Sequence, residues 1–410
     1  MVKYLLDIDR LVKMHEDWRM NRCINLIPSE NITSERVRRY LASDLGHRYS
    51  LRGREVPEFL SPENENFYCG TKYIEKIEEI GEDLAQKIFK CRHAFLQPLS
   101  GHIAGMIVLV ALTVRGDKIM FINTNDGGYP GYTYVSQYLG LKEKTIPFDS
   151  ERFNIDYDRF EKEVFKVKPK LVILGASSIL FPYNLKRVRE ICDRVDAYIG
   201  YDASHVLGLI AGKMFQPDPF ENGVDILFGS THKTFFGPQG GIILTDNDDI
   251  AEKILRNMKL KMLDNPHLNR IAGLVQALWE FLMYGEKYAK QVVHNAKALG
   301  KYLDANNIPI KYGELGYTES HQILLDIEKI EEKSGLKYSQ IARKMEEANI
   351  IIDLGGRIGT QEISRIGMKE KDMKLIANLF SEIVIEKKSI DIVRKKVLNI
   401  RGKFTKICYC

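Results

Sequence analysis

The chain has 410 residues, of which 44% are hydrophobic and 28% are charged, and its formal net charge is +5. This length exceeds what one hydrophobic core usually supports, so two domains are expected. The small and scattered net charge argues against a nucleic-acid partner, and no apolar run approaches the roughly 20 residues that a membrane span needs.

In chain order, the first prediction is an N-terminal arm over residues 1–25 with an amphipathic helix, because Leu5, Ile8, Leu11 and Met14 recur at helical spacing. Helices are then expected at 75–90, 103–112 and 185–195, and short apolar strands at 118–122, 170–174, 197–201, 225–228 and 241–244. Strands that alternate with helices predict an α/β fold with a mostly parallel sheet covered on both faces. Ligands bind beyond the carboxyl ends of such strands.

The sequence of the C-terminal part of the chain indicates a second, smaller domain. A long helical segment from about 273 to 306 is expected to link the domains. We therefore predict a large cofactor-binding domain over 26–285 and a smaller C-terminal α/β domain over 286–410. Within the latter, 322–327 is expected to be a strand and 337–345 a helix.

The six cysteines show no framework spacing, which favours a reducing cytoplasm over a disulfide-forming compartment. Cys408 and Cys410 end the chain as a CxC motif, for which a metal or redox role is one interpretation. A frayed terminus is the better prediction for so short a tail.

A glycine-rich loop, GSTHKTFFGPQGG over residues 229–241, places Lys233 after one buried strand, and Asp202 ends the buried strand before it. Pyridoxal 5′-phosphate (PLP) requires such a pair, because the acid holds the protonated pyridine nitrogen and the lysine forms a Schiff base with the aldehyde. His205, three residues after the acid, could stack on the ring or hydrogen-bond to the ring or to Asp202. The alternative is a helix-capping aspartate and a surface lysine.

A phosphate site is predicted at Ser100 and Gly101, which directly precede an apolar helix. Their backbone N–H groups and the serine hydroxyl can hold a phosphate at the positive end of that helix. A plain N-cap serine is the alternative. Ser230 and His232, close to the lysine, are further cofactor-binding candidates.

Arg357 lies in the glycine-bounded turn Gly355–Thr360. A planar guanidinium there suits bidentate capture of an amino-acid carboxylate, and the alternative is a surface arginine in a turn. Arg365, a few residues later, is expected to have a structural role.

Several motifs together resemble the serine hydroxymethyltransferase family of fold type I PLP enzymes. They are NLIPSENITS at 25–34, QPLSG at 97–101, ASHVLGLIAG at 203–212, STHKT at 230–234 with GPQGG at 237–241, and RIGT at 357–360. The resemblance implies an aspartate-aminotransferase-like fold, with a large mostly parallel-sheet domain and a smaller α/β domain. It also implies PLP as cofactor and a homodimer that builds each site from two chains.

The resemblance assigns roles to further residues. Ser29 matches a residue on the substrate-carboxylate side of the pocket, and Ser177 matches a serine near the cofactor. Tyr49 matches a catalytic tyrosine, and Tyr68 matches a tyrosine that the family donates across its dimer. His102 stands where the family usually has a second phosphate-loop serine.

Three other positions depart from the family pattern. Leu51 replaces the glutamate that serves proton transfer and the pterin, and Glu55 or Glu58 are candidates to substitute for it. Tyr129 replaces the histidine that stacks on PLP, which an aromatic face can also do. The sequence Asp-Asn-Pro at 264–266 replaces a Gly-Gly-Pro that reaches the neighbouring subunit's phosphate. An aspartate there disfavours that contact.

Three functional hypotheses follow. The resemblance implies interconversion of serine and glycine with a tetrahydropterin one-carbon carrier. Because leucine cannot move a proton, Leu51 supports a second hypothesis, a pterin-independent PLP aldolase, lyase or transferase acting on another amino acid. The third is a non-catalytic PLP-binding paralogue, against which the retention of Asp202 and Lys233 argues.

Overall fold

The computed structural model describes residues 2–53 and 65–410, and the chain divides into two units. The larger unit comprises residues 31–290 together with Cys410, and the smaller comprises residues 1–30 and 291–409. The first thirty residues thus group with the C-terminal part, whereas the sequence predicted a separate arm over 1–25. No helix in the described ranges is long and apolar enough to cross a membrane.

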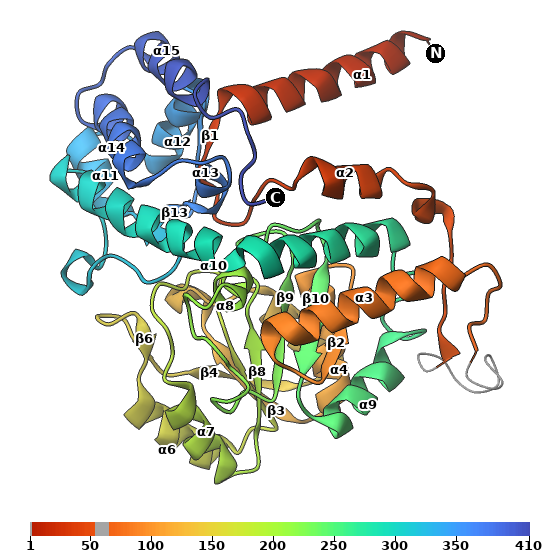
Figure 1. Cartoon of the computed structure of the whole chain (residues 1–410). Coiled ribbons are helices and arrows are strands. Elements are labelled where there is room, and N and C mark those ends of the chain that lie inside the picture. Colours follow the sequence, from red (N-terminus) through yellow and green to blue (C-terminus); the bar gives the residue numbers. More distant parts are fainter. Residues whose placement is uncertain (1, 54–64) are drawn as a thin grey trace. The chain divides into compact units, whose positions relative to one another are not determined.

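A seven-stranded sheet occupies the middle of the larger unit (Figure 1). In spatial order its strands are β2 (His93–Phe95), β10 (Gly241–Thr245), β9 (Ile226–Ser230), β8 (Tyr198–Asp202), β7 (Leu171–Leu174), β3 (Lys118–Ile122) and β4 (Lys142–Ile146). Strands β9, β8, β7, β3 and β4 run parallel, and β10 is antiparallel to both of its neighbours. All five predicted strands are present in this sheet, which confirms the mostly parallel α/β prediction.

Helices flank this sheet. The helices that begin in the larger unit are α2 (Glu35–Leu41), α3 (Lys72–Phe89), α4 (Gly101–Leu112), α5 (Gly131–Leu139), α6 (Tyr157–Val167), α7 (Leu185–Asp193), α8 (Leu207–Ala211), α9 (Asp248–Met258) and α10 (Leu268–Ala305). Helix α4 packs against β9 and β10, and α9 packs against α4. Both α4 and the central strands are apolar almost throughout because both are covered, and their side chains form one buried cluster.

The larger unit also contains short elements. They are the antiparallel pair β5 (Phe148–Asp149) and β6 (Asn154–Ile155) and the 3₁₀ turns Asp44–His47 and Thr124–Asp126. Ser34 caps α2, because its side chain accepts a hydrogen bond from the N–H of Val37 at 3.2 Å. Glu30 and Asn31, which precede this helix, have other partners, Asn25 and the Lys233 carbonyl respectively.

The smaller unit consists of short strands and helices. They are α1 (Val2–Glu16), a π-helical turn Asp17–Arg22, β1 (Ile24–Asn25), a 3₁₀ turn Gly313–Leu315, β11 (Gln322–Leu324), α11 (Ile327–Ser334), α12 (Tyr338–Glu347), β12 (Ile350–Ile351), β13 (Arg357–Gly359), α13 (Gln361–Arg365), α14 (Glu370–Val384) and α15 (Ile390–Arg401). Strand β1 pairs with β12 in parallel, and β11 pairs with β13 antiparallel. The strand predicted over 322–327 is present over Gln322–Leu324 and ends before α11 begins at Ile327, and the helix predicted over 337–345 is present as α12.

The C-terminal residues are held in place, which corrects the prediction of a frayed tail. The guanidinium of Arg365 is fully buried and donates to the carbonyl oxygens of Cys408 and Tyr409. The N–H of Cys408 donates in return to the Arg365 carbonyl at 2.7 Å. All six cysteines are free, and within the described residues no cluster of three or more His, Cys, Asp or Glu side chains is arranged for a metal.

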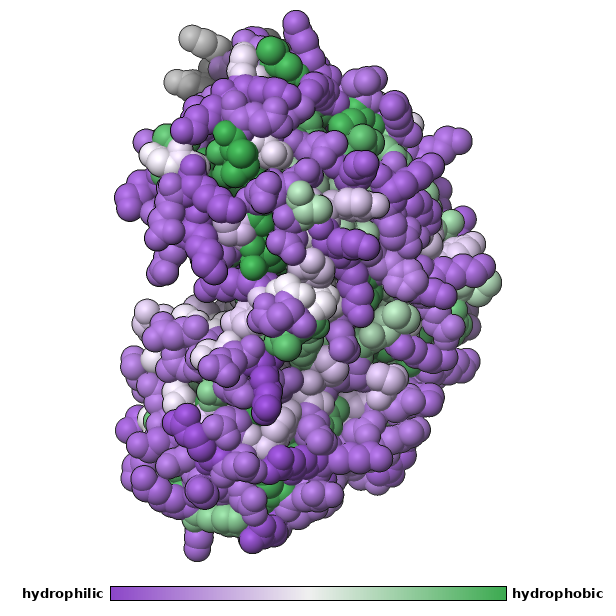
Figure 2. Space-filling view, turned by 90° about the vertical axis from the view of Figure 1, so that its left-hand side faces the viewer, coloured by the Kyte–Doolittle hydropathy of each residue, from purple (hydrophilic) through white to green (hydrophobic). Residues whose placement is uncertain are grey.

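Figure 2 shows one face on which hydrophilic residues predominate and hydrophobic ones form separate small patches. On α1, Ile8, Leu11 and Met14 are all more than half exposed, at 59%, 63% and 56%. The predicted helical spacing is therefore present there, and the side chain of Leu5 lies outside the described residues.

Candidate cofactor and substrate site

Asp202 ends β8 with its carboxylate held by two hydrogen bonds. Its Oδ2 accepts from the hydroxyl of Tyr132 on α5 at 2.6 Å, and its Oδ1 accepts from the N–H of Ser204 at 3.0 Å. Burial, reinforced by the charge of Asp202, raises the pKa of Tyr132 well above its ordinary value, so the hydroxyl keeps its proton and donates. Both of these donors are neutral groups.

Lys233 lies three residues beyond β9, in the loop that joins β9 to β10. Its carbonyl oxygen accepts from Asn31 Nδ2 at 2.6 Å, and the same amide contacts the hydroxyl of the buried Tyr288 at 2.9 Å. The next residue, Thr234, donates to the carbonyl of His205 at 2.8 Å. These bonds fix the backbone on both sides of the lysine amine and tie it to the segment that follows Asp202.

His232, directly before the lysine, carries a buried ring nitrogen. Its Nδ1 has no hydrogen-bond partner among the described residues. Burial, and then the positive charge of Lys233, lowers the pKa of His232 to about 4. The imidazole is therefore neutral at pH 7 and can accept or donate one hydrogen bond at this nitrogen.

Ser100, Gly101, Ser204 and Ser230 lie together at the N-terminus of α4. The Ser100 hydroxyl caps the helix by accepting from the N–H of Ile103 at 3.1 Å. The N–H of Ser230 donates to Ser204 Oγ at 3.0 Å, and the two hydroxyl oxygens are 3.4 Å apart. Hydroxyls from three segments thus meet at the positive end of a twelve-residue helix, which suits a phosphate.

Comparison with known proteins identifies the family. Residues 5–380 match the family model described as serine hydroxymethyltransferase. A relative of that name from Archaeoglobus fulgidus is 42% identical, over 98% of this chain and 92% of its own length. One from Methanocaldococcus jannaschii is 41% identical, over 99% and 95%. The chain belongs to the serine hydroxymethyltransferase family. It is a PLP-dependent transferase, as the motifs predicted.

A solved structure confirms the fold type. An L-threonine transaldolase from Pseudomonas fluorescens superposes with a TM-score of 0.89 and covers 100% of this chain and 94% of its own. The two sequences are 24% identical, so the likeness speaks for the fold alone. This serine hydroxymethyltransferase family member therefore has the fold type I architecture that its motifs implied.

The residues present fit PLP. Gly101 faces the serine cluster, and a side chain there would occupy the space next to Ser204 and Ser230. The Asp202 carboxylate can hold a protonated pyridine nitrogen, and the buried His232 Nδ1 can bond a polar atom of the cofactor. A carboxylate that accepts from two neutral donors, a neutral imidazole nitrogen and a hydroxyl-lined helix end match the ring nitrogen, a polar substituent and the phosphate.

Gly101→Ala is expected to weaken PLP binding by about tenfold or more, because a phosphate contact is worth over 1 kcal/mol. The alanine Cβ would lie 2.3 Å from Ser230 Oγ and 2.9 Å from Ser204 Oγ, so the cradle must deform. Equilibrium dialysis of PLP against the refolded apoprotein measures this. Gly105→Ala on the same helix is the control, since its Cβ meets no atom closer than 3.3 Å. Equal affinity in both variants would contradict a phosphate at this helix end.

Tyr129 lies beside this acid and helix end. Its ring is perpendicular to that of Tyr132, with centroids 5.5 Å apart, and its hydroxyl is 3.1 Å from His102 Nδ1. Burial and the charge of Asp202 raise its pKa. Two of the positions that depart from the family pattern, Tyr129 and His102, therefore contact each other. Stacking of Tyr129 on the cofactor ring remains a prediction. Ser177 follows β7 and is half-buried.

Tyr49 and Tyr68 are brought together, although nineteen positions separate them in the chain. Their ring centroids are 5.5 Å apart, and both rings are substantially exposed. Leu51 is instead buried, at 5% exposure, and its backbone bonds Asn66 and Phe67. Leucine at this position thus fills a packed interior. The proposed substitutes for the family glutamate, Glu55 and Glu58, lie outside the described residues.

The loop at 264–266, whose sequence differs from the family pattern, is bound by two buried basic side chains, Lys259 and Arg270. Lys259 Nζ donates to the Asp264 carbonyl at 3.1 Å. Arg270 donates to the Pro266 carbonyl at 3.0 Å and to the carbonyls of Leu96 and Gln97 at 2.7 and 3.1 Å. Burial lowers the pKa of Arg270 to about 10. Arg270 therefore joins this loop to the strand end that leads into the phosphate segment.

Arg357 and Ser29 belong to the smaller unit. Arg357 begins β13, and its Nε donates to Asp353 Oδ2 at 2.9 Å. With 23% of its side chain exposed, Arg357 is neither a free surface arginine nor fully covered. Asp353 orients the guanidinium, whose planar shape suits a ligand carboxylate. Ser29 is half-buried in the loop that follows β1.

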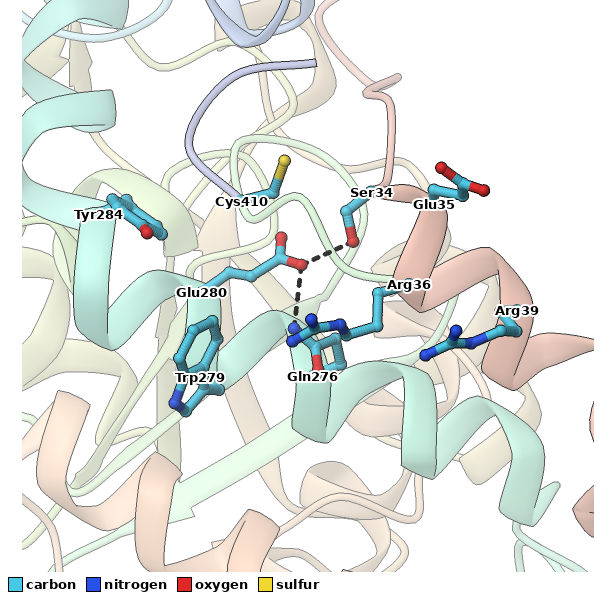
Figure 3. Close-up of a pocket in the computed structure, with 9 residues that line it drawn as sticks. All are labelled: Ser34, Glu35, Arg36, Arg39, Gln276, Trp279, Glu280, Tyr284 and Cys410. Carbon is cyan, nitrogen blue, oxygen red and sulfur yellow. Dashed lines mark hydrogen bonds between the residues drawn. The ribbon is translucent and has the colours of Figure 1, made fainter. Parts of the chain in front are cut away.

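A separate pocket of about 450 Å³ lies between α2 and α10 (Figure 3). Its lining residues are Ser34, Glu35, Arg36, Arg39, Gln276, Trp279, Glu280, Tyr284 and Cys410. At its floor the buried Glu280 accepts hydrogen bonds from Ser34 at 2.6 Å and Gln276 at 3.2 Å (Figure 3). None of the predicted site residues lines it, so it is distinct from the cofactor site.

Three residues near the site were missed by the sequence interpretation. Tyr132 binds Asp202 across 70 positions, and Asn31 binds the Lys233 carbonyl across 202 positions. A local sequence pattern cannot predict contacts between residues so far apart in the chain. Ser204 is different, because it lies two residues after the acid in the motif Asp-Ala-Ser-His, where a hydroxyl at a strand end could have been noticed.

Proposed function

We propose that this chain interconverts serine and glycine and transfers the one-carbon unit to and from a tetrahydropterin. The observation that carries the proposal is the Asp202 carboxylate, anchored by Tyr132 at the end of β8. Strand β9, which leads into the Lys233 loop, pairs directly with β8. Acid and lysine therefore leave the same edge of the sheet, as a PLP enzyme of this family requires.

The chain's own residues have separate tasks. Bound PLP supplies an electron sink for the charge left at the substrate Cα when a bond there breaks. The Asp202 carboxylate holds the proton on the ring nitrogen, and Lys233 Nζ holds the aldehyde carbon. Ser100, Gly101 and Ser230 bind the phosphate, and His205 contacts the ring or Asp202. Because its pKa is about 4, His232 adds no positive charge beside the lysine at neutral pH.

The substrate carboxylate is assigned to Arg357 and Ser29. The bond from its Nε to Asp353 holds the Arg357 guanidinium in a defined plane, and a planar guanidinium suits a carboxylate. Fixing the carboxylate sets which bond at Cα is aligned with the cofactor ring. Tyr49 is assigned to the hydroxymethyl side of the substrate. Tyr68, whose ring contacts that of Tyr49, is assigned to the neighbouring subunit's site.

A second function is favoured by one observation. Leu51 is buried where the family carries a glutamate for proton transfer and the pterin. A pterin-independent aldolase, lyase or transferase would need the electron sink and the carboxylate clamp but no such glutamate. The two functions differ in their need for the pterin, so the pterin dependence of the reaction decides between them.

The deciding experiment gives the purified PLP-loaded protein L-serine with and without tetrahydropterin and follows glycine by chromatography. Under the proposal glycine forms only when the pterin is present. L-Threonine without pterin is the parallel substrate for the second function. Equal glycine formation with and without pterin would overturn the first function, and no turnover with a panel of amino acids would revive the non-catalytic paralogue.

We further propose a homodimer with shared active sites, in the cytoplasm. The family membership supports an oligomer, and the exposed Tyr68 ring supports its donation to a second chain. The six free cysteines support a reducing compartment. Amino-acid and one-carbon metabolism are the corresponding cellular roles, with no nucleic-acid or membrane partner.

A further inference from the structure

The Ser29 loop, residues 25–30, is fastened to the strand that carries Arg357. The N–H of Gly359 on β13 donates to the carbonyl of Leu26 at 2.8 Å. The two segments approach so closely that a Cβ on Gly359 would lie 2.6 Å from Pro28 Cα. The two residues assigned to the substrate carboxylate therefore sit on segments that touch, within one unit.

Buried side chains reinforce this contact. Gln361, the first residue of α13, donates through Nε2 to the carbonyls of Ile27 at 2.7 Å and Glu30 at 2.6 Å. His321 Nε2 is 3.2 Å from the Pro28 carbonyl. Both side chains are fully buried. Carbonyl oxygens on both sides of Ser29 are thus bound by side chains next to β13.

Asn25 adds a bridge between two carboxylates. Its Nδ2 donates to Glu30 Oε2 at 2.8 Å and to Glu362 Oε2 at 2.7 Å. An amide group has two hydrogens, so one Asn25 can serve both acids. Arg19 also pairs with Glu30. The bridge closes the Ser29 loop at its two ends and joins it to α13.

The protonation of Glu362 is set by these neighbours. Burial raises the pKa of Glu362 to about 7. The hydrogen bond from Asn25 lowers this pKa, and the negative charge of Glu30 raises it further. The positive charges of Arg19 and Arg401 lower it. Cys23, the remaining titratable neighbour, has its pKa raised to about 12 by burial and stays neutral. Glu362 is therefore mostly neutral at pH 6 and mostly ionised at pH 8, where its negative charge adjoins Glu30.

We propose that Asn25 and Glu362 are positioning residues of the substrate-carboxylate site, which hold the Ser29 loop against the Arg357 strand. This rests on the proposed function, because it takes Ser29 and Arg357 as the carboxylate ligands. Neither Asn25 nor Glu362 is placed on the substrate. Loosening the loop therefore weakens binding of the amino acid in all states alike, which raises KM and leaves kcat nearly unchanged.

The proposal predicts a pH dependence of its own. As pH rises through about 7, ionised Glu362 repels Glu30 across the shared amide, and glycine binding weakens. In Glu362→Gln the amide oxygen still accepts from Asn25 but cannot ionise. The ratio of the wild-type to the variant Kd for glycine should therefore rise between pH 6 and 8, even though the glycine amine titrates equally for both.

The test measures the glycine Kd by calorimetry on the PLP-loaded full chain, with KM and kcat for serine. Glu362→Ala and Asn25→Ala are expected to weaken glycine binding about tenfold, with kcat within about twofold. Glu362→Gln is expected to match wild type at pH 6. Glu332→Gln, an exposed glutamate of the same unit, is the control and should change nothing.

Arg357→Ala, measured in parallel, separates the two levels of the proposal. If it leaves glycine binding unchanged, the assignment of the carboxylate site fails. If it weakens binding while Asn25→Ala and Glu362→Ala do not, the positioning role alone is overturned. Should Glu362→Ala fail to fold, Asn25→Ala and the pH profile of Glu362→Gln decide; a Kd ratio constant from pH 6 to 8 overturns the role of Glu362.

Discussion

Lys233→Ala is expected to lower kcat/KM for serine by about a thousandfold or more, which corresponds to about 4 kcal/mol of transition-state stabilisation. The amine is the only assigned covalent anchor of the cofactor, and alanine offers no nucleophile in its place. Asn31 and Thr234 hold the backbone at this point through main-chain atoms of residues 233 and 205. The loop should therefore keep its shape in the variant, and the loss should be chemical.

Mass spectrometry after borohydride reduction checks the anchor independently of activity. The wild-type chain should gain the mass of reduced cofactor on the peptide that contains Lys233, and the variant should not. Lys186→Ala, an exposed lysine on α7, is the matched control and should keep both activity and label. A label of equal yield in Lys233→Ala, or more than a tenth of the activity, would mean that another amine carries the cofactor.

The sequence predicted the central sheet because its signal is local. Runs such as 119–122 and 242–244 are apolar throughout, because both faces of the sheet are covered. Such runs indicate that a strand is buried, but they do not indicate whether it runs parallel or antiparallel to its neighbours. In the structure β10 is antiparallel to β9. The ten residues between these strands already favour this, because a parallel crossover needs a dozen or more.

The site was predicted in part for the same reason. Asp202 and Lys233 each lie near the end of a buried strand, and local pattern was enough to select them. Tyr132 and Asn31 act across 70 and 202 positions, and they became visible only when the chain had folded. The same holds for the Ser29 loop, whose partners Gln361 and Glu362 lie more than 300 positions away in the chain. For this reason the predicted domain boundary at residue 25 separated the N-terminal arm from segments that it packs against.

Asp202→Asn is expected to lower kcat/KM by about a hundredfold, or about 2.7 kcal/mol, while the protein retains most of its cofactor. Asparagine has the same shape, so its oxygen can still accept from the Ser204 N–H, which lies 3.0 Å from Oδ1. The substitution removes the negative charge that keeps the ring nitrogen protonated, and with it the electron sink. The measurement is steady-state kinetics together with the PLP content of the purified variant.

Tyr132→Phe is the matched control for this charge. It removes the 2.6 Å hydrogen bond to Asp202 Oδ2 but leaves the carboxylate itself in place, so a smaller loss of about tenfold is expected. If the charge is what matters, adding Tyr132→Phe to Asp202→Asn costs little more, because the hydroxyl acts only through the carboxylate. Additive losses would instead give Tyr132 a task of its own, and an Asp202→Asn variant with near wild-type turnover would remove Asp202 from the catalytic machinery.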